Sequence, residues 1–206
     1  DEERTLELFE GWNMVSINVD PREYYENEDD MGPDIIAMFE QARIDEDNHR
    51  VRLLKDGDGH FWSPEWGFIN IEYWNLTEGY QVAMVEDFDI TLEGEVVPAD
   101  APIELRPNWN MIAYFPTYDL DASAPDFYVL SPIIEDVILA KDGNGRFIAT
   151  DFGFSNMQPW TEGQGYQVKI DPELQEDIVL NYPEAQEDVA FRSVEEHNAH
   201  WTAPVN

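Results

Sequence analysis

Three blocks of sequence occur twice in the chain, in the same order, and this duplication limits the possible folds more than any other feature. The paired blocks are GWNMVSI (11–17) with NWNMIAY (108–114), LKDGDGHF (54–61) with AKDGNGRF (140–147), and WNLTEGYQV (74–82) with WTEGQGYQV (160–168). An internal repeat sets the architecture of the chain that carries it. We therefore expect one β unit at residues 1–97, a second at 98–184, and a tail at 185–206 that belongs to neither.

The first unit is longer than the second. Trp12 recurs as Trp109, 97 positions later, whereas Trp74 recurs as Trp160, 86 positions later. The first unit therefore carries about eleven extra residues, which we place in the polar stretch 21–31 because insertions usually lie in surface loops.

Most segments have the pattern of short strands, which are rich in β-formers and bounded by Gly, Pro, Asn and Asp. This pattern predicts a mainly β fold, with two tandem antiparallel units that are sandwich-like and contain at most one short helix each. In the first unit, Pro33 precedes a helix with one apolar face, formed by Ile35, Met38, Phe39 and Ala42. The equivalent stretch of the second unit contains Pro132, so we expect only about one turn of helix there. Two arrangements remain open: separate sandwiches, or units interlocked as one pseudo-twofold body.

The chain is strongly acidic, with 45 Asp and Glu against 11 Lys and Arg and a net charge of −34. Such a surface repels nucleic acids and anionic membranes, so we expect neither as a partner. Two settings explain the acidity: a saline, halophilic habitat in which salt screens self-repulsion, or an extracellular protein that uses divalent cations. The absence of cysteine excludes disulfides, thiol nucleophiles and Cys-ligated metals.

No run of the sequence reaches the ~18 apolar residues of a membrane span. The polar start DEERTLELFEGW fits a mature chain whose signal peptide has been removed, and an internal piece of a longer protein would look the same.

The repeated DGxG segments are candidates for calcium binding. Their oxygen-bearing side chains are Asp56, Asp58, Asp142 and Asn144. An EF-hand loop requires a glutamate at its twelfth position, and both segments have glycine there, so this type of calcium site is excluded. We expect tight hairpin turns, with calcium in another geometry as the alternative.

Aromatic side chains are the candidates for glycan binding, because a ring face on a β surface can stack on a sugar. The pairs repeated in both units are expected to be core: Trp12 with Trp109, Trp74 with Trp160, and Tyr80 with Tyr166. We expect exposed rings among the others, and the carbohydrate-binding candidates are Trp62, Trp66 and Tyr73.

The sequence contains no GxSxG, P-loop, GxGxxG or HExxH motif. With 45 acidic residues, a pair of carboxylates carries no specific signal for hydrolysis. His197 and His200 lie three residues apart beside two glutamates, but tail histidines of this kind are usually solvated surface. We predict that the chain is not an enzyme and needs no cofactor, calcium excepted.

The blocks GWNMVSI and KDGDGHFWSPEWGFINIEYWNLTEGYQV, together with their second copies, resemble tandem modules of large secreted and cell-surface proteins of Bacteroidota and related bacteria. The resemblance covers residues 6–182 and implies a non-catalytic, β-rich extracellular module with a structural, adhesive or spacer role. Its expected partners are other copies of itself or neighbouring domains, and glycans in the alternative of a carbohydrate-binding module. A strand at 188–194 would pair with the sheet edge of a neighbouring copy, as in filaments.

Overall fold

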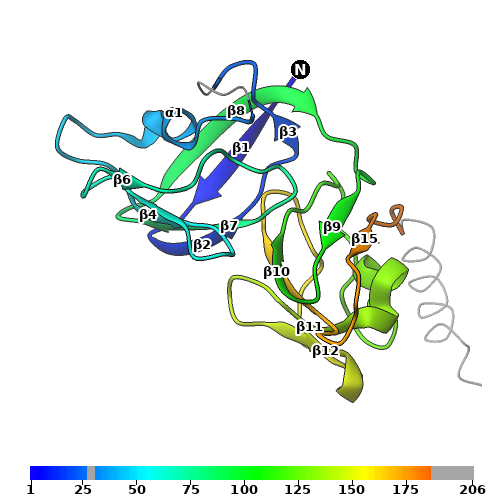
Figure 1. Cartoon of the computed structure of the whole chain (residues 1–206). Coiled ribbons are helices and arrows are strands. Elements are labelled where there is room, and N and C mark those ends of the chain that lie inside the picture. Colours follow the sequence, from blue (N-terminus) through cyan, green and yellow to red (C-terminus); the bar gives the residue numbers. More distant parts are fainter. Residues whose placement is uncertain (27–30, 187–206) are drawn as a thin grey trace, which may run out of the picture.

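The computed structural model describes residues 1–26 and 31–186, and it shows the predicted mainly β, sandwich-like fold (Figure 1). The strands of the first unit are β1 (Glu2–Leu8), β2 (Gly11–Val15), β3 (Val19–Asp20), β4 (Val51–Lys55), β5 (Phe61–Ser63), β6 (Phe68–Ile69), β7 (Tyr80–Met84) and β8 (Phe88–Val96). The strands of the second are β9 (Ile103–Leu105), β10 (Asn108–Ile112), β11 (Val137–Lys141), β12 (Phe147–Ala149), β13 (Phe154–Ser155), β14 (Tyr166–Ile170) and β15 (Ile178–Leu180). All strand pairs within the sheets are antiparallel.

The two units share one sheet topology. The large sheet of the first unit has the strand order β2-β7-β4-β5-β6, and that of the second has the matching order β10-β14-β11-β12-β13. The smaller sheets are β1-β8-β3 and β9-β15. The strand β3 follows the first repeated block and has no counterpart in the second unit, which agrees with the extra residues of the first.

Each unit has its own apolar core between its sheets. In the first unit, the alternation of β1 and β8 directs Leu6, Leu8, Ile90 and Leu92 inward, onto Val82 of the large sheet. In the second, residues of the five-stranded sheet pack with Leu105 and Leu180 from the smaller one.

The helices cover the cores and are short. The α-helix α1 (Ile35–Met38) and the 3₁₀ helix η1 (Glu40–Ala42) place the predicted face of Ile35, Met38, Phe39 and Ala42 in the core. Asp34 caps α1 by accepting a hydrogen bond from Ala37 N at 2.8 Å.

The second unit has the 3₁₀ helices η2 (Tyr128–Asp136) and η3 (Thr150–Phe152). The helix η2 is longer than the single turn expected around Pro132. It packs its apolar side against the core, where Val129, Leu130 and Ile133 are buried.

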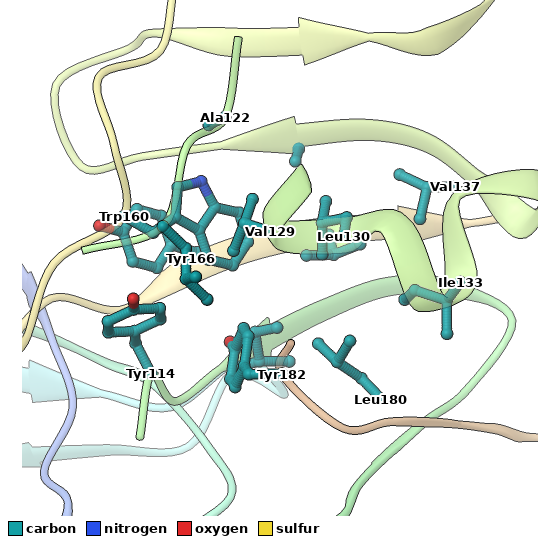
Figure 2. Close-up of a cluster of buried hydrophobic side chains, with 14 of the residues drawn as sticks. Tyr114, Ala122, Val129, Leu130, Ile133, Val137, Trp160, Tyr166, Leu180 and Tyr182 are labelled. Atoms are coloured by element: carbon teal, nitrogen blue, oxygen red, sulfur yellow. The ribbon is translucent and has the colours of Figure 1, made fainter. Parts of the chain in front are cut away.

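A Trp–Tyr pair in close ring contact lies in each core, stacked in the second unit and tilted by 31° in the first. The ring centroids of Trp160 and Tyr166 are 3.9 Å apart, with Tyr114 and Tyr182 beside them, as Figure 2 shows. The equivalent pair, Trp74 and Tyr80, has the same separation of 3.9 Å. These four rings confirm the prediction that the third repeated block supplies core aromatics.

The units meet about a pseudo-twofold relationship. Ser16 N donates to Gly163 O at 3.1 Å, and its counterpart Ala113 N donates to Thr77 O at 3.0 Å. Two further bonds, Gly165 N to Met14 O and Gly79 N to Met111 O, follow the same relationship. Each unit keeps its own sheets and core, and these reciprocal contacts join the two units at a shared boundary. The predicted strand at 188–194, together with His197 and His200, lies outside the described residues.

Candidate functional site

The DGxG segments form the hairpin turns between β4 and β5 and between β11 and β12. Asp56 Oδ1 accepts from the backbone N of Asp58 and of His60, each at 2.9 Å. Asp142 Oδ1 accepts from Asn144 N and Arg146 N at the same distance. One oxygen of each leading aspartate is therefore used by its own turn. Among the described residues, no group of three or more His, Cys, Asp or Glu is arranged to hold a metal ion.

The turns also pack across the boundary between the units. A Cβ on Gly57 would lie 3.3 Å from Met111 Cβ, and a Cβ on Gly143 would lie 3.2 Å from Met14 Cβ. Each turn therefore lies against the opposite unit, so the repeated glycines have a packing role as well as a turn role.

The three candidate glycan-binding rings have different environments. Trp62 is only 3% exposed and packs edge-on against Phe39 and His49, so the expectation that it is exposed was wrong. It is buried because it occupies an inward position of β5, whose pairing partner is Leu54 of the core. Tyr73 is half-buried and lies against Gly32. Trp66 is 77% exposed and lies in the turn between β5 and β6.

Trp66 has a counterpart that the sequence reading missed. Phe152 lies 86 positions later in DFGF, which matches EWGF around Trp66, and it is 86% exposed. Both turns are closed by a glycine with positive φ, Gly67 at 60° and Gly153 at 55°. Trp66 and Phe152 are the two most exposed large apolar side chains of the described residues. We name the turns that carry Trp66 and Phe152 the aromatic tips.

Each aromatic tip continues into a pair of phenylalanines. The rings of Phe61 and Phe68 are 5.0 Å apart, and those of Phe147 and Phe154 are 5.2 Å apart. The strands β6 and β13 beside these rings are the edge strands of the two large sheets. A tip therefore combines an exposed ring, partly exposed neighbours and unpaired backbone groups.

Trp12 and Trp109 are exposed, which corrects the prediction that they are core. They are 49% and 37% exposed. Lys55 Nζ lies 4.6 Å from the ring centroid of Trp12, and Lys141 Nζ and Lys169 Nζ lie 4.9 and 5.9 Å from that of Trp109. All three lysines of the chain thus lie over these two rings.

A cavity of about 340 Å³ beside the first turn contains the carboxylates of Asp56, Asp58 and Glu78 together with Tyr80. Burial, and then the charges of Asp56 and Asp58, raise the pKa of Glu78. Arg106 from the second unit donates to Asp58 Oδ1 at 2.9 Å. The raised pKa of Glu78 is therefore explained by its burial and by the neighbouring carboxylates. Asp58 is already paired with Arg106.

Comparison with protein-family models, curated protein sequences and solved structures finds no significant match for the chain. No helix within the described residues is long and apolar enough to cross a membrane.

Proposed function

We propose that the chain is a non-catalytic structural or adhesive module of a secreted or cell-surface protein, and that it works through its two aromatic tips. The observation that carries this proposal is the exposure of Trp66 and Phe152 at equivalent positions of the two units. Large aromatic side chains dominate the energetics of many protein interfaces, because a flat rigid ring buries much apolar area at a small entropic cost.

The positions of the tips favour a linking role. The turn after β5 and the turn after β12 lie far apart, at the left and at the lower right of the view in Figure 1. A body with two distant contact points connects two neighbours rather than enclosing one ligand. The proposed partners are other copies of the chain or neighbouring domains, joined at the tips and along the edge strands β6 and β13.

The charge of the chain sets the conditions for such contacts. A net charge of −34 opposes close approach of two copies at low ionic strength. In 1 M salt the Debye length is only about 3 Å, so the repulsion is largely screened while apolar contacts persist. Self-association is therefore expected to increase with salt, as a saline habitat would require.

Sedimentation velocity in low salt and in molar NaCl, with EDTA throughout, tests this proposal. The unmodified chain should form oligomers that lengthen with concentration in high salt. Trp66→Ala and Phe152→Ala should each stop at dimers, because one tip remains, and the double variant should stay monomeric. Val179→Ala, at an exposed apolar side chain away from the tips, is the matched control and should behave as the unmodified chain. A chain that stays monomeric throughout, or a double variant that still forms oligomers, would contradict the proposal.

A carbohydrate-binding module is the alternative, and the exposure of Trp66 is the observation that favours it. Depletion of the chain from solution by insoluble polysaccharides such as cellulose or chitin, and loss of that depletion in Trp66→Ala, would support this alternative. If neither polysaccharide depletes the chain from solution, the linking role remains the proposal.

A further inference from the structure

Two related grooves lie along the boundary between the units, and one is continuous whereas the other is divided. Groove A has a volume of about 480 Å³ and includes Trp12 of the first unit and Arg146 of the second. Groove B, the equivalent region with Trp109, consists of two separate cavities: one of about 140 Å³ at Trp109, and one of about 340 Å³ at His60, the counterpart of Arg146. Since the backbone relationship is shared, the difference has to come from side chains.

One ion pair explains the difference. In groove B, Arg106 donates to Asp58 Oδ1 at 2.9 Å and spans the boundary. The residues at the equivalent positions of groove A are Phe9 and Asn144, which cannot form an ion pair. The backbones correspond, because Phe9 N donates to Asn13 Oδ1 as Arg106 N donates to Asn110 Oδ1. Groove A therefore stays open where groove B is bridged.

Groove A combines aromatic faces with free polar groups. Phe9 is 59% exposed and Trp12 is 49% exposed. The polar side chains that line the groove and make no hydrogen bond within the described part of the chain are those of Asn144, Arg146, Gln158, Thr161 and Gln164. Amide and hydroxyl groups of this kind both donate and accept hydrogen bonds.

The charge of groove A limits what it can bind. Glu7, Glu10 and Asp142 face it against the cation of Arg146, and Lys55 Nζ lies beside it, 4.6 Å from the ring centroid of Trp12. This balance disfavours an anionic ligand and admits a neutral or a cationic one. Uncharged, flat-faced ligands with many hydroxyl groups match both the rings and the amides.

We infer that groove A is a binding site for a short segment of a neutral polysaccharide, stacked on Trp12 and Phe9 and hydrogen-bonded by the amides of the second unit. Its volume falls within the range of roughly 300–1,000 Å³ that is typical of ligand sites. This inference does not depend on the aromatic tips, which belong to different turns.

Calorimetric titration of the full chain with cellohexaose, xylohexaose and mannohexaose tests the inference, with hexalysine as a cationic probe. At least one hexasaccharide should bind, and Trp12→Ala should weaken it about tenfold, the effect of about 1.4 kcal/mol from one lost aromatic platform. The double variant Phe9→Arg/Asn144→Asp copies the ion pair of groove B into groove A and should abolish binding. Its thermal midpoint should stay near that of the unmodified chain, because the repeat already accommodates this pair.

The variant Trp66→Ala/Phe152→Ala separates this inference from the proposed function, since it removes both tips and should bind the saccharide as the unmodified chain does. Loss of saccharide binding in that variant would move the site to the tips and overturn the inference. No binding by any hexasaccharide at about 10 mM, about tenfold above a dissociation constant of about 1 mM, would overturn it as well. Binding of hexalysine alone, or unchanged affinity in Phe9→Arg/Asn144→Asp, would also contradict it.

Discussion

The Cα of Gly165 lies 3.4 Å from the position that a Cβ on Gly79 would occupy, so these two glycines face each other across the boundary between the units. The same Cβ on Gly79 would lie 2.9 Å from Ile112 O, and a Cβ on Gly165 would lie 2.9 Å from Val15 O. The nearest neighbours are these carbonyl oxygens, which belong to the bonded boundary and cannot move away as the side chains of Met111 and Met14, at 3.1 and 3.3 Å, can. Glycine is therefore required at both positions by close approach.

Gly79→Ala and Gly165→Ala are each expected to lower the free energy of unfolding by about 1–3 kcal/mol, the usual cost of overpacking. Urea unfolding followed by circular dichroism measures the change. Gly57→Ala is the matched control, because its Cβ meets only side-chain and backbone atoms of Met111 at 3.3 Å or more, and it should lose less. Equal losses at all three positions would argue against a boundary that is specifically tight at Gly79 and Gly165.

The repeated tryptophans are expected to differ in their contribution to stability. Trp74→Ala and Trp160→Ala remove rings that are at most 1% exposed and lie 3.9 Å from a tyrosine ring, centroid to centroid, so each should cost about 3–5 kcal/mol. Trp12→Ala removes an exposed ring and one contact with Lys55, which is worth about 0.5–1 kcal/mol at such a site. Urea unfolding of the three variants provides the comparison. A loss in Trp12→Ala as large as in Trp74→Ala would show that the ring of Trp12 is buried.

The stability of the chain should depend on pH through Glu78. Burial first, and the charges of Asp56 and Asp58 next, raise the pKa of this carboxyl group in the folded state. The folded protein then binds the proton more tightly than the unfolded chain, so stability from this group is present below the unfolded pKa and is lost as the pH rises through the folded pKa. Glu78→Gln removes this loss, and its stability relative to the unmodified chain should grow with pH across that window and then stay constant.

Gln164 makes Glu78→Gln a conservative test, because the second unit already has the neutral amide at this position. Urea unfolding at pH values from about 4 to about 8, around the usual glutamate range, supplies the measurement. Gln164→Glu is the control. The stability contributed by this new glutamate should depend less on pH than that contributed by Glu78, because Asn144 takes the place of the charged Asp58 in the second unit. A constant difference between Glu78→Gln and the unmodified chain would rule out a perturbed Glu78.

The leading aspartates of the two turns should stabilise the chain without any ion. Asp56→Ala and Asp142→Ala each remove an oxygen that accepts two backbone hydrogen bonds, and should cost about 0.5–2 kcal/mol, as the loss of a helix cap does. Thermal unfolding in EDTA and in millimolar calcium distinguishes the alternatives. A loss seen only in calcium would instead show that the turns hold calcium.

Much of the fold was predictable from the sequence, because it depends on local patterns. Strand alternation indicated the β units, the DGxG segments indicated turns, and the spacing of Ile35, Met38, Phe39 and Ala42 indicated the buried face of the helix. The stacked pair of Trp160 and Tyr166 followed from its repetition.

The repetition of a residue in both units does not distinguish a core position from a position at the boundary between the units. Trp12 and Trp109 recur because of their place beside the opposite unit and under the lysines, and the same pattern would arise from burial. The correspondence between Trp66 and Phe152 was missed because the two residues are not identical. Aligning EWGF with DFGF at the 86-residue offset would have found it. Groove A depends on Phe9 meeting residues that lie more than 130 positions later, a contact that no local pattern encodes.

The repeated blocks join the two units into one body, and native-state hydrogen exchange at the boundary is the most direct test of this joining. The amides to follow are those of Ser16, Gly79, Ala113 and Gly165, which form the four backbone bonds across the boundary. We expect these amides to exchange only through global unfolding, with the same free energy as the core strands β7 and β14. Exchange at a free energy well below the global value, with β7 and β14 still protected, would show that the units separate while folded and would contradict the claim.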